Sequence, residues 1–373
     1  MKRIQRNIGL VIVSALVVAG IIYFEGQGPP NIGTTKNAEI ESIEGNADKA
    51  SKYPKAKEIV SPSGFINTGG EEITIEELIG KKVILVDFWT YSCINCQRTF
   101  PYLNNWYEKY SEEGLEIVGI HTPEFDFEKD YENVTAAVEK FNIEYPVVLD
   151  NDYATWQAYS NRYWPRKYLI DIDGYIVYDH IGEGAYEETE GKIVELLNER
   201  SQQLGMGEVE MKHDAPENVD NVDFTQVKTP ETYLGYKRLE YIHEFPRGTC
   251  YGNKCNYELP QNISLNEFAF GGEWFMGPEN SELRSDEGDI LIKFSANKVN
   301  LVAGAPEGAR AEIYLDGEKI SSENSGFSVS DGIVEFNDHA LYNLVDLGGN
   351  YGEHTLRIHF LEPEVSVFAF TFG

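Results

Sequence analysis

Four cysteines carry the strongest chemical signal in the sequence, and they form two local pairs. Cys93 and Cys96 enclose the dipeptide Ile-Asn, and Cys250 and Cys255 enclose the tetrapeptide Tyr-Gly-Asn-Lys. A C-x-x-C pair can exchange disulfides, form a structural disulfide or supply half of a zinc site. The residues around each pair favour one of these chemistries over the others.

The first pair lies between an apolar segment, residues 83–89, and a segment with helical spacing. A cysteine at the start of a helix lies beside unpaired backbone N–H groups and the positive end of the helix dipole, which favour its thiolate. We therefore expect Cys93 to be the nucleophile. Cys96 would lie one turn deeper, where it can attack a mixed disulfide on Cys93 and release the partner. This reading needs no cofactor besides the redox-active Cys93–Cys96 disulfide.

The two alternatives for Cys93 and Cys96 are weaker. A zinc site needs four ligands, but the sequence has no second C-x-x-C, and none of its 7 histidines shows a paired spacing beside the first motif. We therefore expect no metal. A purely structural bond across so short a loop would restrict the unfolded chain little.

The second pair lacks this strand-to-helix context. Cys250 and Cys255 flank a turn-like segment, and in an oxidising compartment we expect them to form a small structural disulfide. A second redox relay and a pair of free thiols are the alternatives.

Alternating strand-like and helix-like segments around the first pair predict an α/β domain. Asp173-Gly174 is the strongest short hairpin signal in this part of the chain. The expected strands span 83–89, 115–120, 146–149, 168–172 and 175–179, and the expected helices run from the cysteine pair to about 110 and cover 134–141 and 187–202.

The C-terminal part has short β-rich runs separated by Gly, Asn and Asp turns, which predicts an all-β sandwich. Asp316-Gly317 and Asp331-Gly332 have the composition of hairpin turns. The clearest runs are 290–294, 299–303, 311–315, 356–360 and 365–372.

The chain has 373 residues, more than the roughly 250 to 300 at which a single core stops growing, so two folded domains are expected. Acidic, aperiodic or Gly/Pro-rich stretches mark the linkers. We expect an N-terminal anchor at 1–25, a linker at 26–62, the α/β domain at 63–202, a second linker at 203–229 and the β domain at 230–373.

The N-terminus predicts a membrane anchor. Lys2, Arg3 and Arg6 precede an uncharged run, residues 8–24, at the lower length limit for a spanning helix, and no A-x-A-like cleavage site follows directly. A cleaved signal peptide is the alternative. The positive-inside rule places the remaining chain on the extracytoplasmic side, where disulfides persist.

The formal net charge of -31 would repel a phosphate backbone, so we expect no nucleic-acid partner. A solvated acidic surface accounts for this charge.

The segment VDFWTYSCINC at 86–96 resembles the active-site strand and helix of thioredoxin-like proteins. The wider chain, roughly 60–373, is similar to the extracytoplasmic redoxin portion and C-terminal β domain of DipZ proteins, near the TlpA-like thiol–disulfide oxidoreductases. The further matching segments are HTPEF at 121–125, YPVVLDND at 145–152, NRYWP at 161–165 and TPETYLGY at 229–236. The resemblance implies a thioredoxin-like fold followed by a carbohydrate-binding-module-like sandwich.

Three residues gain roles from this resemblance. Pro165 matches the cis-proline that faces the cysteine pair, and Trp164 before it would offer its backbone to a bound substrate; a trans proline starting a strand is the alternative. Asp87 matches the internal acid of thioredoxins, whose buried carboxyl can accept a proton from Cys96. A solvent-exposed Asp at a strand end is the alternative there.

The resemblance also concerns partners. DipZ proteins carry a multi-helix membrane domain that brings electrons across the bilayer, whereas this sequence has one candidate span. We therefore expect a separate membrane electron donor of the CcdA type. Ile94-Asn95 differs from the Gly-Pro of thioredoxin, and because this dipeptide tunes reduction potential, the direction of electron flow is left open.

The resulting expectation is an extracytoplasmic thiol–disulfide oxidoreductase that acts on protein thiols and disulfides, as a reductase or isomerase rather than an oxidase. One alternative is a thiol peroxidase, because Thr90-Tyr91-Ser92-Cys93 matches the T-x-x-C part of the peroxiredoxin signature, although Val86 replaces its proline. Another is an envelope ligand-binding protein with an inactive redoxin domain. In that case aromatic side chains of the β domain, such as Trp274, Phe275 or Tyr314, could stack on a glycan.

Overall fold

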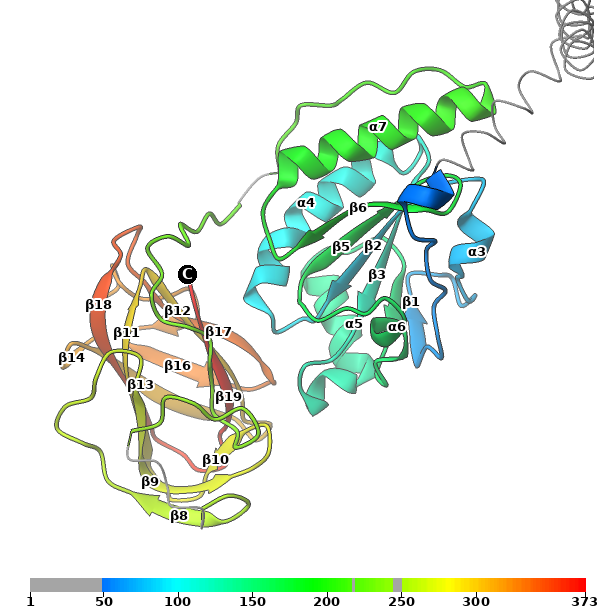
Figure 1. Cartoon of the computed structure of the whole chain (residues 1–373). Coiled ribbons are helices and arrows are strands. Elements are labelled where there is room, and N and C mark those ends of the chain that lie inside the picture. The colour runs from blue at the N-terminus through cyan, green and yellow to red at the C-terminus, as the bar shows by residue number, and fades with distance from the viewer. Residues whose placement is uncertain (1–48, 217–218, 244–249) are drawn as a thin grey trace, which may run out of the picture. The chain divides into compact units, whose positions relative to one another are not determined.

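The computed structural model describes residues 49–216, 219–243 and 250–373 (Figure 1). The chain divides after Tyr53, and residues 54–373 form one compact unit. The anchor expected at 1–25 lies outside the described residues. Within the described ranges, no helix has the length and apolar character needed to cross a membrane.

The first half of this unit is built on a 6-stranded sheet with helices on both faces (Figure 1). The strand order is β1-β4-β3-β2-β5-β6; β2 pairs in parallel with β3 and antiparallel with β5. This is the thioredoxin-like arrangement expected from the sequence. The strands are β1 Gly64–Ile66, β2 Val83–Trp89, β3 Leu115–His121, β4 Val147–Leu149, β5 Arg166–Ile170 and β6 Ile176–Ile181.

The central strand β2 is buried along its whole length, so its alternating side chains enter two cores. Leu85 and Trp89 belong to the core that includes residues of α4, α5 and α7. Val86 and Phe88 enter the opposite core with Ile75 of α3. The helices are α3 Ile75–Leu78, α4 Ile94–Tyr110, the 3-10 helix η1 Asp126–Lys129, α5 Tyr131–Lys140, α6 Ala154–Ala158 and α7 Tyr186–Leu204.

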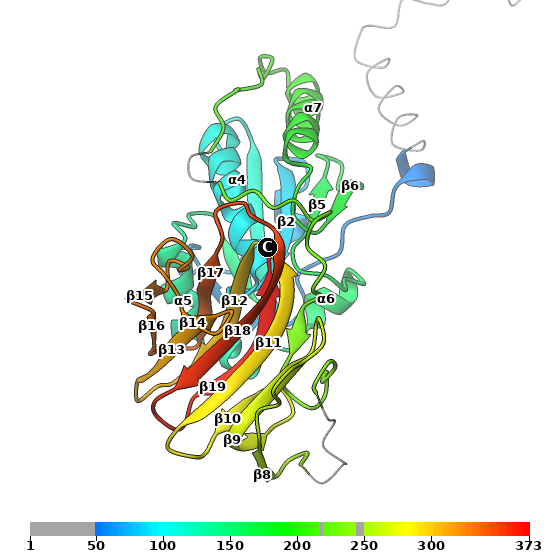
Figure 2. The ribbon, with the colours of Figure 1, turned by 90° about the vertical axis from the view of Figure 1, so that its left-hand side faces the viewer.

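The second half is all-β, as expected. In the described residues its strands form a 13-stranded antiparallel network, and β9 joins its two parts by pairing with both β10 and β11. Strands β11 and β18 run side by side from Gly288↔Phe360 to Ala296↔Gly352 (Figure 2). The strands are β7 Thr232–Tyr233, β8 Lys254–Tyr257, β9 Phe268–Met276, β10 Ser281–Leu283, β11 Gly288–Ala296, β12 Lys298–Gly304, β13 Ala309–Leu315, β14 Glu318–Lys319, β15 Val329–Ser330, β16 Ile333–Phe336, β17 Ala340–Asp346, β18 Gly352–Phe360 and β19 Ser366–Phe372.

The hairpin joining β13 to β14 turns at Asp316-Gly317, as the sequence predicts. Both residues have positive φ, 53° and 87°, which is the backbone that a tight two-residue hairpin turn requires. Asp331-Gly332, with φ of 52° and 73°, turns in the same way between β15 and β16.

Candidate active site

Cys93 and Cys96 lie where β2 gives way to α4. Cys93 is the N-cap of α4 and is partly exposed, whereas Cys96 is fully buried, and both are free thiols. The Cys96 N–H lies 3.4 Å from Cys93 Sγ and 3.1 Å from the Cys93 carbonyl oxygen. An N–H group at a helix start favours negative charge on the sulfur it faces. Cys93 is therefore the accessible sulfur of the pair, and Cys96 lies behind it.

Asp87, which the family resemblance assigns as the internal acid, lies on β2. It is fully buried, and desolvation raises its pKa to about 7, while the positive charge of Lys167 acts in the opposite direction. Among the described residues, neither carboxyl oxygen of Asp87 has a hydrogen-bond partner. Burial also raises the pKa of Cys96, and the neighbouring Cys93 and Asp87 act in the same direction. A buried carboxyl with a raised pKa thus acts through its charge on a buried thiol, whose pKa it raises further.

Lys167 is a residue that the sequence analysis missed. It is the register partner of Asp87 on β5, is fully buried, and donates from Nζ to the Gly182 carbonyl at 3.1 Å. Desolvation lowers its pKa. One signal in the sequence could have identified it, because Lys167 directly precedes the apolar run of a buried strand. Lysine is almost never fully buried without a specific partner, so a lysine at this position indicates a special role.

The Trp164–Pro165 peptide bond is cis. The Trp164 indole N–H donates to the Thr122 carbonyl at 2.9 Å, and its ring lies 4.3 Å from that of Trp156. Trp164 and Cys93 line the same cleft. The structure therefore brings together the redox pair and the residue that the family resemblance assigns to substrate binding.

Glu128 is a second residue that sequence reasoning missed. Its fully buried carboxylate accepts four hydrogen bonds: from the Ser92 N–H at 3.2 Å, the Ser92 hydroxyl at 2.6 Å, the Glu124 N–H at 2.6 Å and the Phe125 N–H at 3.0 Å. Burial raises its pKa, and the hydrogen bond from Ser92 opposes that shift. Glu128 therefore ties the residue before Cys93 to the loop after β3. No sequence motif predicts the role of Glu128, because its hydrogen-bond partners are mostly backbone groups.

Cys93 opens into a cleft of about 590 Å³. Ile94 and Trp164 line it from the α/β half of the unit, and Phe224, Tyr233 and Phe372 line it from the C-terminal half. The site thus includes residues from beyond the thioredoxin-like sheet, which the sequence analysis did not foresee.

Cys250 and Cys255 form a disulfide, and Cys255 lies on β8. The two pairs therefore differ in state, because the cysteines at the head of α4 are free thiols. A structural role for the second pair stays a prediction.

The aromatic residues named as glycan-stacking candidates differ in exposure. Trp274 is fully buried and donates from its indole to the Gly271 carbonyl at 2.9 Å, so the expectation that it could stack on a sugar is wrong. It packs instead within the β core, where its large apolar ring is removed from water. Phe275 and Tyr314 remain half-buried.

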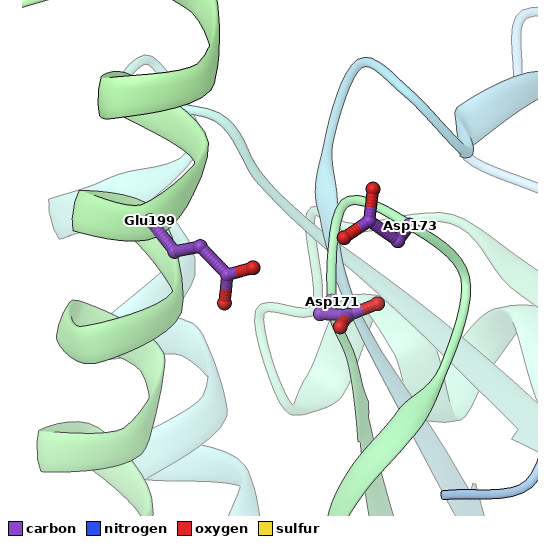
Figure 3. Close-up of side chains that lie close together, drawn as sticks. All are labelled: Asp171, Asp173 and Glu199. Atoms are coloured by element: carbon purple, nitrogen blue, oxygen red, sulfur yellow. The ribbon is translucent and has the colours of Figure 1, made fainter. Parts of the chain in front are cut away.

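Asp171, Asp173 and Glu199 form the acidic group shown in Figure 3, in which one oxygen of each lies within 4.8 Å of the others. These carboxylates have protein partners: the Gln203 amide lies 3.4 Å from oxygens of both Asp173 and Glu199, and Asp171 accepts from the Tyr175 N–H at 2.8 Å. An acidic protein forms such groups without a metal. We assign no metal here, and the expected absence of a metal stays a prediction.

Comparisons with known proteins find matches for both halves of the unit. The redoxin family model matches residues 49–197, and the model described as thioredoxin like C-terminal domain matches 229–373. The protein DipZ of Mycobacterium tuberculosis is 31% identical over 346 residues, which cover 92% of this chain and 46% of DipZ. The chain thus spans about half the length of the curated DipZ relatives it matches.

Two shorter relatives are covered over most of their length. The thiol-disulfide oxidoreductase ResA of Bacillus thuringiensis is 33% identical over 127 residues, 34% of this chain and 70% of ResA. The thiol-disulfide oxidoreductase YkuV of Bacillus subtilis is 30% identical over 128 residues, 34% of this chain and 86% of YkuV. A solved thioredoxin-like protein in its oxidized form is 27% identical, with a TM-score of 0.36, and the match covers 40% of this chain and 98% of that one. The similarity to ResA and YkuV over most of their length shows that the chain belongs to the redoxin family of thioredoxin-like thiol–disulfide oxidoreductases, as its sequence motifs indicated.

Proposed function

We propose that this protein exchanges disulfides with protein clients on the extracytoplasmic side of a membrane, as a reductase or isomerase rather than an oxidase. The observation that carries the proposal is the placement of the two sulfurs: Cys93 faces a cleft at the head of α4, and Cys96 is fully buried behind it. This arrangement separates the sulfur that meets the client from the sulfur that resolves the intermediate.

In the reductive direction, the Cys93 thiolate attacks one sulfur of a client disulfide. The client S–S bond breaks, a Cys93–client disulfide forms, and the other client sulfur leaves as a thiolate that takes a proton. Cys96 then loses its proton and attacks Cys93 Sγ, which forms the Cys93–Cys96 disulfide and releases the client as a dithiol. Two electrons pass from the cysteine pair to the client.

Asp87 supports the second step. Cys96 must lose a proton in a buried environment that raises its thiol pKa. The Asp87 carboxyl is also buried and acts on Cys96 through its charge, and its pKa of about 7 makes it a proton acceptor that is ionised in part at neutral pH. We therefore assign Asp87 as the general base for Cys96.

The oxidised pair needs a reductant to return to the dithiol form. We propose a separate membrane electron donor of the CcdA type, acting on a protein anchored by residues 1–25. The charge pattern of Lys2, Arg3 and Arg6 ahead of the apolar run supports this orientation. A thiol-specific reagent that does not cross membranes should label Cys93 in intact cells; labelling only after lysis would contradict the location.

The peroxidase alternative gains no support from Thr90, the first residue of its partial motif. Thr90 is fully buried, and its hydroxyl lies 3.4 Å from His121 Nε2. A glycan at the β-sheet region remains a proposal that depends on half-buried residues such as Phe275 and Tyr314.

Mixed-disulfide trapping tests the exchange. In the Cys96→Ser variant, Cys93 should remain bound to client proteins through adducts that dithiothreitol releases, because the resolving sulfur is missing. The matched Cys93→Ser variant should form none. Absence of adducts with both native membrane proteins and model disulfides would refute the mechanism.

The reduction potential of the Cys93–Cys96 pair tests the direction. A value near about -270 mV, the thioredoxin range, is expected of a reductant, whereas a value near about -120 mV would assign the protein as an oxidant.

A further inference from the structure

We propose that the C-terminal half of the unit forms one wall of the client-binding cleft, and that this wall selects a flexible client segment with apolar side chains next to its cysteine. The inference rests on the proposed exchange at Cys93 and names the client class. It assigns a recognition role to Phe224, a residue that lies outside both the thioredoxin-like sheet and the β strands.

The cleft beside Cys93 is lined by apolar residues from both halves of the unit. Ile94 and Trp164 belong to the α/β half, and Phe224, Val227 and Phe372 belong to the C-terminal half. A client sulfur that reaches Cys93 Sγ brings its neighbouring side chains between these surfaces. Burial of apolar surface on both sides would then contribute to binding.

The wall is held in place by contacts with the loop after β3. The rings of Phe125 and Phe368 lie 5.1 Å apart within a buried cluster. The Arg238 guanidinium lies 2.7 Å from the Glu124 carboxylate, which also accepts from the Tyr233 hydroxyl at 2.9 Å. The same loop is bound to Ser92 through Glu128. The wall and the residue before Cys93 are therefore connected through one short segment.

The chain around Phe224 is anchored at both sides. The Asp223 N–H donates to the Tyr351 hydroxyl at 2.9 Å, and the Ser295 N–H donates to the Thr229 hydroxyl at 2.7 Å. Phe224 itself is 50% exposed, with its ring 5.8 Å from the Arg98 guanidinium. An anchored but exposed aromatic ring in a cleft is typical of a recognition residue, since aromatic side chains dominate binding energy at interfaces.

Size and charge indicate what fits this cleft. A volume of about 590 Å³ lies in the range that holds a small ligand or a few residues, and it does not admit a folded domain. The lining holds two acidic residues, Glu124 and Glu231, and two basic residues, Arg162 and Arg238, and Glu124 is paired with Arg238. The cleft therefore presents no large excess of either charge, despite the net charge of -31 on the whole chain. An uncharged segment that unfolds from its protein, or has not yet folded, suits both properties.

The experiment compares three disulfide probes with the full chain: hydroxyethyl disulfide, a short peptide disulfide with Phe and Leu beside the cysteine, and the same peptide with Ser in their places. The rate constant for reaction with reduced enzyme is measured for wild type, Phe224→Ala and Phe224→Leu. The matched control is Phe327→Ala, which truncates a phenylalanine that is 79% exposed and does not line the cleft.

We expect Phe224→Ala to slow the apolar peptide by about fivefold to tenfold, the range for loss of one aromatic contact worth roughly 1 to 1.4 kcal/mol. Hydroxyethyl disulfide and the Ser peptide should change less than twofold, Phe224→Leu should retain most of the apolar rate, and Phe327→Ala should match wild type. Equal slowing of all three probes, or no slowing of any, would overturn the client class. If wild type reacts with none of the probes, the proposed exchange itself fails.

Discussion

Asp87 and Lys167 are register partners on neighbouring strands, and both side chains are fully buried. The ammonium donates to the Gly182 carbonyl, and neither Asp87 oxygen accepts a hydrogen bond from the described residues. Each group therefore acts on the other mainly through charge. Because burial opposes the ionised form and the opposite charge favours it, the carboxyl remains poised to exchange a proton.

The rate of mixed-disulfide resolution should rise with pH and level off above a midpoint of about 7, where Asp87 ionises and can accept the Cys96 proton. Asp87→Asn should slow resolution by roughly a hundredfold, the lower end for loss of a general base, and should remove this inflection. Rapid-quench measurement of the Cys93–client adduct checks both. An unchanged inflection in the variant would remove Asp87 from the mechanism.

The same carboxyl should make the fold less stable at neutral pH than in acid. The pKa of Asp87 is raised from 3.8 to about 7, so between these values the folded protein binds a proton that the unfolded chain has lost. The contribution of Asp87 to the free energy of unfolding should therefore fall as pH rises across this window, by about 4 kcal/mol in total, and not change further above it. Asp87→Asn should abolish this loss, so its advantage over wild type in urea unfolding should be larger at pH 8 than at pH 4.5. An advantage that does not depend on pH would contradict the shift.

Replacement of Lys167 should change the pH dependence of the resolution rate more than the maximal rate of disulfide exchange. The positive charge lowers the pKa of Asp87, so Lys167→Met should raise that pKa above 7 and move the midpoint of the resolution rate to higher pH. Lys167→Arg, which keeps the charge, is the matched control. If Lys167→Met leaves the midpoint in place, the two residues are not coupled.

Loss of the Glu128 carboxylate should weaken the loop before Cys93. Glu128→Gln keeps one acceptor oxygen but turns an amide toward two backbone N–H donors, leaving buried donors unsatisfied. We expect a loss of roughly 2 to 4 kcal/mol in the free energy of unfolding, measured in urea. Glu139→Gln, at an exposed position of α5, should change it by less than about 0.5 kcal/mol. Equal losses of stability in both variants would show that the hydrogen bonds of Glu128 do not stabilise the fold.

The Cys250–Cys255 disulfide should be dispensable for exchange. The double replacement Cys250→Ser with Cys255→Ser opens a very short loop, and we expect a stability loss of about 2 kcal/mol. The rate of reaction with model disulfides should match wild type. A large fall in this rate with the fold intact would assign the second pair to electron transfer.

The parts of the fold that were predictable have strong local patterns. The apolar strand β2 and the helix α4 behind the cysteines were expected almost to their bounds, and so was the Asp316-Gly317 turn. The short elements β1, α3 and α6 were not expected, because three to five residues carry too little periodicity to distinguish helix from strand.

The parts of the site that were not predictable depend on residues far apart in the sequence. Cys93 and Cys96 are recognisable from their own spacing, whereas Lys167 acquires its meaning only from the register of β5 against β2. Glu128 accepts from Ser92, a residue on another segment, and no local pattern encodes that contact. Phe224 faces the cleft because its segment is fixed to distant residues, which a reading of neighbouring residues cannot reveal.

The burial of Cys96 fixes the order in which the two redox partners can react with the protein. Since only Cys93 meets the solvent, the client that receives electrons and the donor that replenishes them must dock at the same sulfur, one after the other. Turnover should therefore follow ping-pong kinetics, with parallel lines in double-reciprocal plots, and an excess of either partner should inhibit by occupying the cleft. The two partners need not resemble each other, but both must offer a sulfur on a segment slender enough to enter.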